Sequence, residues 1–226
     1  MHLLILGRGK TGKLVAEAAR TRHHQVQALA SKENQGACAL TPDNLGTVDI
    51  VIDFTTPRAV LENVEACLRA GKNMVVGTTG WYDELPRVRQ MVDQSGTGFL
   101  YAANFSIGVN LFCEIVRSAA HCLRHDYHGQ VFERHHASKK DAPSGTAVAL
   151  ARIIREASGA DLEVTSFREG EVVGMHELVF DSPVDTIYLC HDAKSRLGFA
   201  EGAVRGAEWL AGKKGFFDFE QIWAEL

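Results

Sequence analysis

The sequence predicts an α/β protein with two domains, a doubly wound parallel sheet followed by a second α/β domain that contains a mixed sheet. Short apolar runs alternate with helical segments of ~10–15 residues through roughly the first hundred positions. A glycine-rich loop separates the first apolar run from the first helical segment. Between residues 162 and 192 the alternation gives way to short β-rich pieces, which indicate an antiparallel or mixed sheet.

The first domain is expected to begin with a buried strand, because residues 2–6 form a short apolar run. After the glycine-rich loop, Leu14, Val15 and Ala18 recur at helical spacing. Similar patterns predict strands at residues 25–30, 48–54, 73–76 and 98–102, and helices at residues 59–70 and 83–95. Strands and helices that alternate in this way, joined by short loops, are typical of doubly wound sheets.

The second half of the chain has a different pattern. It predicts a long apolar helix at 108–121, a strand at 129–133, a helix at 144–158, β-rich pieces at 163–167, 172–173, 176–180 and 185–191, and a helix at 202–210. A Gly-Lys-Lys-Gly break at 212–215 and a short tail follow. We expect one domain to comprise residues 1–105 plus 196–226, because the C-terminal segment should pack back on it, and a second domain to comprise residues 106–195.

Composition excludes several classes of protein. Hydrophobic residues make up 46% of the 226 positions and charged residues 23%, and the net charge of −4 comes without a long basic run, so nucleic acid is not an expected partner. No apolar segment approaches the roughly 18 residues of a membrane span, and the apolar start is too short for a secretory signal. Five scattered cysteines without a Cys-x-x-Cys pair indicate reduced thiols in a cytoplasmic protein and no metal site.

The glycine-rich loop predicts a dinucleotide-binding site of the Rossmann type. Its residues are Gly7, Arg8, Gly9, Lys10, Thr11 and Gly12. Glycines allow a tight turn and a close approach of the backbone to a pyrophosphate at the helix N-terminus. Such a match is weak alone, and a simple strand–helix turn is the alternative. Its position between the first strand and the first helix makes the dinucleotide interpretation specific, so residues 1–105 plus 196–226 are predicted to bind the cofactor.

The end of the second strand bears on the choice of cofactor. NAD-binding sites of this type usually place an acidic residue there, on the ribose hydroxyls. Here Ser31 occupies that position with Lys32 beside it, and a hydroxyl next to a cation favours a 2′-phosphate and hence NADPH. Glu33 could turn inward instead, and a solvated loop is a further alternative. The loops at 53–57, 77–80 and 102–106 end on the same edge of the sheet, where ligands of such folds bind.

Residues 133–146 are the strongest candidate for catalytic chemistry. His135 and His136 are adjacent, Lys139 follows, and a Pro-Ser-Gly-Thr turn opens the next helix. An imidazole can transfer a proton near neutral pH, a lysine supplies positive charge, and a helix N-terminus binds anions. Neighbouring side chains of a strand face opposite ways, so only one of the two histidines should act directly. A metal site is the alternative, but no second cluster of ligands supports it.

At this point the sequence resembles the 4-hydroxy-tetrahydrodipicolinate reductase (dihydrodipicolinate reductase) family. The motifs that carry the resemblance are Gly-Arg-Gly-Lys-Thr-Gly at 7–12, Asp-Phe-Thr at 53–55, Val-Gly-Thr-Thr-Gly at 76–80, Asn-Phe-Ser-Ile-Gly-Val-Asn at 104–110, Glu-x-His-His-x-x-Lys-x-Asp-Ala-Pro-Ser-Gly-Thr-Ala at 133–147, Arg168-x-Gly-x-x-x-Gly174-x-His176, and Ser195-Arg196 with Gly202-Ala203. They occur in order along nearly the whole chain. The run from 133 to 147 is specific enough to indicate the family by itself.

The resemblance implies a reductase of the diaminopimelate route to lysine that uses NADPH or NADH, usually as a homotetramer built through the sheets of the substrate domain. A hydride would add to C4 of a cyclic imine that carries two carboxylates, with His135 as the acid and Lys139 as an assisting donor. His136, Lys139, Gly145 and Thr146 would hold the carboxylates. The nicotinamide end would be lined by Gly77, Thr78, Thr79, Ala102, Ala103, Asn104 and Phe105. Residues 106–195 would thus form the substrate-binding and tetramerisation domain.

Two other functions stay open at this stage. The chain could be another Rossmann dehydrogenase of an amino or hydroxy acid, although the intact His-His-x-x-Lys run argues against a different acid–base group. It could also be a catalytically silent NADP-binding regulator, although such a protein would be expected to lack His135 or Lys139, and both are present. The segment at 31–47 is short, as in a compact form of the family, which leaves the cofactor preference open.

Overall fold

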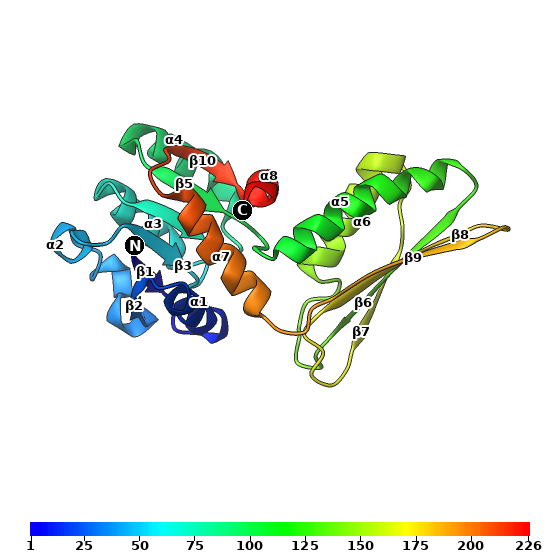
Figure 1. Cartoon of the computed structure of the whole chain (residues 1–226), viewed down its shortest axis with the longest axis horizontal. Helices are drawn as coiled ribbons and strands as arrows, with labels where there is room; N and C mark the ends of the chain where they lie inside the picture. Colours follow the sequence, from blue (N-terminus) through cyan, green and yellow to red (C-terminus); the bar gives the residue numbers. More distant parts are fainter. The chain divides into compact units, whose positions relative to one another are not determined.

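The computed structural model describes residues 1–226, and it divides into two compact units (Figure 1). The first comprises Met1–Ile107 with Leu197–Leu226, and the second comprises Gly108–Arg196. No helix of either unit combines the length and the hydropathy that a membrane span requires.

The first unit contains a six-stranded sheet in which every pair of neighbours is parallel, in the order β10-β5-β4-β3-β1-β2. The strands are β1 (His2–Leu6), β2 (Gln25–Leu29), β3 (Ile50–Asp53), β4 (Asn73–Val76), β5 (Gly98–Tyr101) and β10 (Gly215–Asp218). The helices are α1 (Lys10–Thr21), α2 (Pro42–Leu45), α3 (Val60–Arg69), α4 (Leu85–Ser95), α7 (Leu197–Leu210) and α8 (Phe219–Ile222), with short 3-10 turns at Ser31–Glu33, Gln35–Ala37, Tyr82–Glu84 and Trp223–Glu225. The doubly wound parallel sheet predicted from the sequence is confirmed.

Helices cover both faces of this sheet because both faces of its strands are apolar. In β1, Leu3 and Ile5 belong to the core packed against α1 and α7, whereas Leu4 and Leu6 belong to the core packed against α3 and α4. Successive side chains of a strand point to opposite faces, so a continuous apolar run has to be buried on both. Because all six strands run parallel, their carboxyl ends lie together at one edge of the sheet. The loops at 7–12, 53–57 and 77–80 emerge at this edge.

The C-terminal segment differs from the prediction. Helix α7 begins at Leu197 rather than at residue 202, and the expected tail after the glycine break contains β10, which pairs in parallel with β5. The pairing is reinforced by aromatic contacts, since Phe216 stacks on Phe99 with ring centroids 5.3 Å apart and Phe217 packs edge-on against Trp209 at 5.0 Å. A strand of four residues that begins at a glycine is too short to show a hydrophobic period.

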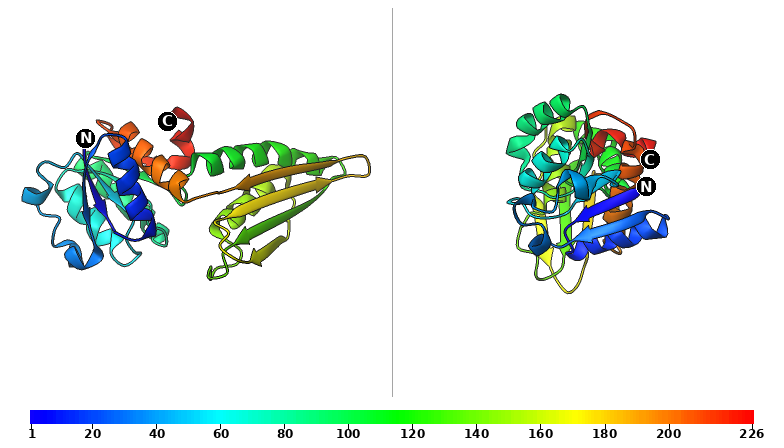
Figure 2. Two further views of the ribbon diagram at one scale, coloured as in Figure 1. Left: turned by 60° about the horizontal axis from the view of Figure 1, so that its bottom comes forward. Right: turned by 90° about the vertical axis from the view of Figure 1, so that its left-hand side faces the viewer.

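The second unit contains a four-stranded mixed sheet in the order β7-β6-β8-β9. Its elements are β6 (His128–His135), β7 (Val164–Arg168), β8 (Met175–Asp181), β9 (Thr186–Asp192), α5 (Ile107–Ala119), α6 (Gly145–Ser158) and a 3-10 turn at Ala120–Arg124. Strands β6 and β7 are parallel, and the other two pairs are antiparallel. Helices α5 and α6 cover one face of the sheet (Figure 2), so the predicted mixed sheet is confirmed.

Two local differences in this unit bear on the site. Strand β6 continues to His135, two residues beyond the predicted end at 133, and this places the histidine in the sheet. Residues 172–173, expected to be a β-rich piece, form part of the connection between β7 and β8 instead. The carbonyl of Val173 lies 3.2 Å from Nδ1 of His135 in this connection. The apolar Val-Val pair therefore shapes a turn against the histidine rather than a strand.

The close approach of α7 to the backbone after β5 gives a matched pair of substitutions. A Cβ at Gly202 would lie 1.7 Å from the carbonyl oxygen of Phe105, whereas a Cβ at Gly198 would meet only the Ser106 hydroxyl at 3.6 Å. We expect Gly202→Ala to destabilise the protein by about 1–3 kcal/mol through overpacking. Gly198→Ala should be neutral or slightly stabilising, because alanine favours a helix. Urea unfolding followed by circular dichroism measures both, and equal midpoints for the two variants would contradict the packing.

Candidate active site

The glycine loop of the first unit has the shape that a pyrophosphate site requires. Gly7 has a φ of +97°, and a Cβ there would lie 2.2 Å from the carbonyl oxygen of Phe54. A Cβ at Gly12 would lie 1.9 Å from the carbonyl oxygen of Gly7. Gly9 is different, because it caps α1 and a Cβ there would meet nothing within 4 Å. The first turn of α1 carries no acidic residue, so an open, positively polarised helix end is available to an anion.

A buried aspartate ties the neighbouring strand-end loops together. Asp53 has no exposed surface, and its carboxylate accepts hydrogen bonds from the Thr55 amide at 2.9 Å and the Thr78 hydroxyl at 2.7 Å. It also accepts from the Asn63 side-chain amide at 2.8 Å and from the Thr55 hydroxyl at 2.7 Å. The Thr78 hydroxyl, which accepts from the Thr55 amide in turn, is thus committed to the loops themselves. Within the 77–80 loop, the backbone and the exposed Thr79 side chain are therefore the parts that could line a ligand.

The end of β2 offers both a hydroxyl and an acid. Ser31 and Lys32 lie exposed in the 3-10 turn that follows β2. The Glu33 carboxylate turns back to accept the Ala30 amide at 2.6 Å and lies 3.9 Å from a guanidinium nitrogen of Arg8. A cavity of about 200 Å³ opens beside these residues, and its lining includes Gly7, Ala30, Ser31, Thr55 and Asn63.

The loop after β5 divides into buried and exposed positions. Ala102 and Phe105 are buried, and the Phe105 ring packs edge-on against Phe219 with centroids 4.8 Å apart. Ala103 is exposed, and the Asn104 side-chain oxygen accepts the Ser106 amide at 2.8 Å. At the 77–80 loop, Thr79 is exposed, and a Cβ at Gly77 would lie 2.2 Å from the Phe54 ring. Among the residues predicted to line the nicotinamide end, Ala103 and Thr79 are therefore the two with exposed side chains, and Asn104 is half-buried.

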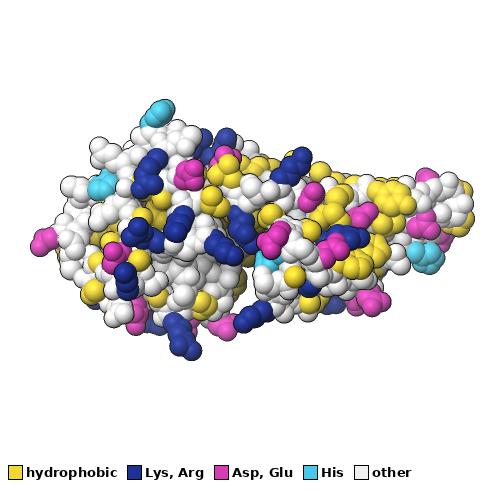
Figure 3. Space-filling model, turned by 90° about the horizontal axis from the view of Figure 1, so that it is seen from below, with side chains coloured by type: hydrophobic (Ala, Val, Ile, Leu, Met, Phe, Trp, Pro, Cys, Tyr) yellow, Lys and Arg dark blue, Asp and Glu magenta, His cyan; other side chains and the backbone are white.

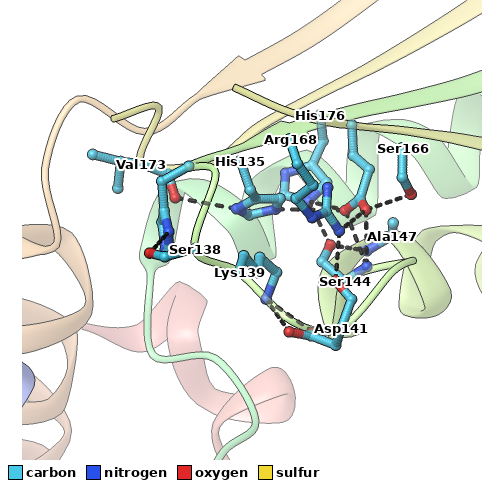
Figure 4. A network of polar contacts seen from close by, with 12 residues as sticks. His135, Ser138, Lys139, Asp141, Ser144, Ala147, Ser166, Arg168, Val173 and His176 are labelled. Atoms are coloured by element: carbon cyan, nitrogen blue, oxygen red, sulfur yellow. Dashed lines mark hydrogen bonds and ion pairs between the residues drawn. The ribbon is translucent and has the colours of Figure 1, made fainter. Parts of the chain in front are cut away.

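In the second unit, His135 ends β6 with its imidazole largely enclosed (Figure 4). Its Nδ1 lies 3.2 Å from the Val173 carbonyl oxygen, which can only accept, so Nδ1 carries the proton. Its Nε2 is buried and lies 3.5 Å from a carboxylate oxygen of Glu133, beyond a regular hydrogen bond. Burial lowers the pKa of His135, and the nearby carboxylate of Glu133 opposes that shift.

Glu133 is the central acceptor of this site, and its side chain is 0% exposed. Its carboxylate accepts from the Ser144 amide at 3.0 and 3.1 Å, from the Ser166 hydroxyl at 2.6 Å and from the Arg168 guanidinium at 2.7 Å. Burial alone would raise the pKa of Glu133, but the bonds from Ser144, Ser166 and Arg168 outweigh it and lower the pKa to about 2. The carboxylate is therefore charged at neutral pH.

His176 of β8 completes the cluster. Its ring lies edge-on to that of His135 with centroids 5.3 Å apart, and its Nε2 lies 3.2 Å from the Ser144 hydroxyl. Burial, followed by the proximity of His135, lowers the pKa of His176 to about 4. One ligand atom each of Glu133, His135 and His176 lies within 4.8 Å of the others. That spacing would suit a metal ion, but the carboxylate already binds Ser144, Ser166 and the cationic Arg168.

The segment between β6 and α6 carries the remaining predicted residues. Lys139, whose side chain is 21% exposed, pairs with both carboxylate oxygens of Asp141 at 2.8 and 2.9 Å. Helix α6 starts at Gly145, where a Cβ would meet nothing within 4 Å, and Thr146 lies in its first turn. The Ser144 hydroxyl caps the helix by accepting the Ala147 amide. An open helix N-terminus beside a lysine is suited to a carboxylate ligand.

The two adjacent histidines have different surroundings. His135 joins the buried cluster, whereas His136 lies just beyond β6 and contacts Ser138 through Nδ1 at 2.8 Å and Arg196 through Nε2 at 3.3 Å. His135 and Lys139 therefore lie on the same segment that leads into α6. His136, in contrast, lies beside Arg196.

Sequence reasoning did not assign Glu133, Arg168 or His176 to the site. All three belong to motifs of the sequence, but their contacts depend on the strand register. In that register Glu133 lies opposite Ser166 of β7 and His176 of β8. The available signal was the Glu-x-His spacing, since alternate residues of a strand share a face. A glutamate on the same face as a catalytic histidine and an apolar core is a candidate for a buried ion pair.

The chain is similar to known proteins over its whole length. A family model described as dihydrodipicolinate reductase, N-terminus, matches residues 1–105, and one described as dihydrodipicolinate reductase, C-terminus, matches residues 108–223. The chain is 33% identical over 240 residues to the 4-hydroxy-tetrahydrodipicolinate reductase of Christiangramia forsetii, with 100% of this chain and 99% of the relative covered. It is 38% identical over 199 residues to that of Chromobacterium violaceum, with 79% and 74% covered.

A solved structure shares the fold. Dipicolinate-bound dihydrodipicolinate reductase from Paenisporosarcina sp. TG-14 superposes with a TM-score of 0.81 at 24% identity, covering 98% of this chain and 99% of the other.

Fold, site and comparisons together define an oxidoreductase of the Rossmann class that uses a nicotinamide cofactor. The chain belongs to the dihydrodipicolinate reductase family. That assignment places it at the reduction step of lysine biosynthesis through diaminopimelate. The resemblance inferred from the motifs is thereby confirmed, and so is the prediction that the chain is an enzyme.

The open space at Gly9 and Gly145 allows the two predicted ligand sites to be tested separately. Gly9→Ala should leave the fold intact, because a Cβ meets nothing within 4 Å, yet weaken cofactor binding about tenfold or more by keeping the pyrophosphate away from the loop. Gly145→Ala should leave cofactor affinity unchanged and raise the KM for substrate. Isothermal titration of NADPH and NADH, with thermal unfolding as the control for folding, measures the first effect. Wild-type cofactor affinity in Gly9→Ala would contradict the site.

Proposed function

We propose that this chain catalyses the NAD(P)H-dependent reduction of 4-hydroxy-tetrahydrodipicolinate, via dihydrodipicolinate, to tetrahydrodipicolinate. The first unit holds the cofactor at the glycine loop, and the second unit holds the substrate at the segment before α6. The observation that carries the proposal is the grouping of His135, Lys139 and the open N-terminus of α6 around the buried Glu133 carboxylate. When bound, the cofactor supplies a hydride to C4 of the cyclic imine.

The protein contributes charge and a proton. Addition of a hydride builds negative charge on the substrate, which a nearby acid neutralises, and we assign that role to His135 with Lys139 as an assisting donor. The two carboxylates of the substrate are held by Lys139, His136 and the start of α6 at Gly145 and Thr146. Lys139 is paired with Asp141, so a substrate carboxylate competes with an internal one for the same ammonium group.

The substrate itself helps to charge the acid. Burial lowers the pKa of His135, so the free enzyme carries a neutral imidazole at pH 7. A doubly negative ligand bound nearby favours the imidazolium and raises that pKa. Because Nε2 is buried beside Glu133, delivery of its proton also requires the ring to turn away from that carboxylate.

The preference between the two cofactors depends on the end of β2. Ser31 and Lys32 are exposed and could hold a 2′-phosphate, which favours NADPH. The Glu33 carboxylate accepts the Ala30 amide and lies close to Arg8. An acid that would bind the ribose hydroxyls of NADH is therefore also present at the end of β2. We therefore propose NADPH as the preferred cofactor and NADH as a second one.

A coupled assay tests the reaction. Purified protein is mixed with a dihydrodipicolinate synthase that supplies fresh substrate, and the loss of the reduced nicotinamide absorbance is followed with NADPH and with NADH in parallel. Oxidation that depends on substrate supports the proposal, and the ratio of the two kcat/KM values decides the cofactor preference. Folded protein that binds a cofactor but oxidises neither would overturn the reductase assignment.

Removal of the acid should slow turnover specifically. We expect His135→Gln to lower kcat by roughly 10²-fold or more, the usual scale for a lost general acid, with cofactor affinity nearly unchanged. The matched control is His136→Gln, which should chiefly raise the KM for substrate because His136 lies outside the buried cluster. Near-normal turnover of His135→Gln would remove that residue from the role of acid.

Lys139 should show a different kinetic signature. Lys139→Met keeps the length of the side chain and removes the charge, so we expect the KM for substrate to rise by about tenfold or more, with a smaller fall in kcat. Asp141→Asn, which removes the negative charge of the lysine's internal partner, should leave KM unchanged or lower it. Steady-state kinetics at fixed saturating cofactor measures both, and a KM unaffected in Lys139→Met would argue against contact with a carboxylate.

The open face of the second sheet supports a homotetramer. Helices cover one face, whereas Phe132, Phe167, Val179 and Tyr188 lie on the other, with Phe167 37% and Tyr188 67% exposed. Figure 3 shows hydrophobic side chains gathered on this face among charged ones. Exposed large apolar side chains on an uncovered sheet face are typical of an interface between protein chains. We propose that copies of this chain associate through it.

We propose a cytoplasmic location on the basis of the thiols. All five cysteines (38, 67, 113, 122 and 190) are free in the structure, and Cys38 and Cys190 are exposed. Exposed thiols persist in a reducing compartment, where disulfides are rare.

A further inference from the structure

We propose that Glu133 is a positioning residue for both halves of the reaction: its buried carboxylate anchors the segment that binds the substrate carboxylates, and it holds the positive charge of His135 when that ring is protonated. The inference deepens the proposed function and rests on His135 acting as the acid.

The first role follows from the contacts of the segment between residues 141 and 144. The Glu133 carboxylate accepts the Ser144 amide at 3.0 and 3.1 Å, immediately before α6 begins. The Arg168 guanidinium nitrogen Nη2 donates both to Glu133 at 2.7 Å and to the Asp141 carbonyl at 2.6 Å. The carboxylate thus fixes the Ser144 end of the segment directly and the Asp141 end through Arg168, and with them the start of α6, where a substrate carboxylate is proposed to bind.

The second role follows from the orientation of the His135 ring. Glu133 and His135 lie two residues apart on β6 and therefore share a face of the sheet. Because Nδ1 keeps its proton against the Val173 carbonyl, the second proton of the imidazolium has to be on Nε2, the nitrogen 3.5 Å from Glu133. Gly174 permits this arrangement, since a Cβ there would lie 2.8 Å from the imidazole Cε1.

The charges around His135 make Glu133 its stabilising partner. The groups that face the ring are Glu133 on β6, Arg168 on β7, His176 on β8 and Lys139 on the segment after β6. Burial, Lys139 and Arg168 all lower the pKa of His135, and Glu133 raises it. After burial, Glu133 is the strongest of these influences, and its carboxylate is the negative charge that favours protonation of the ring.

The test is a pair of charge-removing variants with opposite expected effects. Because His135 acts in its protonated form, kcat/KM falls as pH rises through its pKa in the free enzyme. Glu133→Gln keeps an acceptor for the Ser144 amide but removes the negative charge, so the fall should move to lower pH by on the order of one unit. Arg168→Gln removes the positive charge, so the fall should move to higher pH, by less than the shift expected for Glu133→Gln.

Ser166→Ala is the matched control, because it removes one hydrogen bond to Glu133 and leaves every charge in place. Its pH profile should coincide with that of the wild type, although its stability falls. A role for Glu133 in folding alone would raise KM in both charge variants without moving their profiles in opposite directions. Folded variants whose profiles stay in place, or move in the same direction, would overturn the proposal.

A measurement on the wild-type protein keeps the proposal testable if Glu133→Gln does not fold. Imidazole nitrogen NMR, with the His135 signals assigned by their absence in His135→Gln, should show that the neutral ring carries its proton on Nδ1. A neutral ring protonated on Nε2 would overturn the proposal. The NMR titration of His135 needs no turnover, so an enzyme inactive on the proposed substrate would refute the reaction and still leave the role of Glu133 to be decided.

Discussion

An ionised carboxylate removed from water costs several kcal/mol unless its neighbours compensate it. Glu133 is fully buried, and it is compensated by the Ser144 amide, the Ser166 hydroxyl and the Arg168 guanidinium. Ser144 caps the N-terminus of α6, whereas Ser166 and Arg168 belong to β7. The second unit can bury this charge only if the strands are in register and the segment before α6 is in place. The same requirement fixes the positions at which the proposed acid and the proposed anion site lie.

The first unit uses a similar device. Asp53, the last residue of β3, is buried and accepts hydrogen bonds from Thr55, Thr78 and Asn63, which belong to two strand-end loops and to α3. Asn63 in turn accepts from Asn34, so the segment after β2 joins the same chain of hydrogen bonds. A buried acid at a strand end therefore holds several loops at the edge where the cofactor is proposed to bind. The loops gain a fixed arrangement from one charge rather than from regular secondary structure.

Local sequence patterns predicted most of the fold and only the outer part of the site. Strand β4 was predicted at its observed bounds because Met-Val-Val is a short, partly β-branched apolar run that ends at a glycine, whereas β10 was missed because two phenylalanines between glycine and aspartate show no period. His135 and Lys139 could be proposed from the sequence because their chemistry is visible in the residue types. Glu133, Arg168 and His176 could not be assigned, because their positions depend on how β6 pairs with β7 and β8, whose contacting residues lie more than 30 positions further along the chain.

The charges of the second unit are arranged in pairs before any ligand arrives. Lys139 faces Asp141, Arg168 faces Glu133, and burial disfavours the charged forms of His135 and His176. A neutral molecule would therefore have to break an ion pair to contact Lys139 or Arg168, and it would bring no charge to replace the one lost. The proposed dicarboxylate substrate differs, because one of its carboxylates would replace Asp141 at Lys139 while the added negative charge would raise the pKa of His135. In the proposed reaction, the ligand that displaces Asp141 is also the one whose charge prepares the acid, so recognition of the substrate and protonation of His135 would depend on the same electrostatic balance.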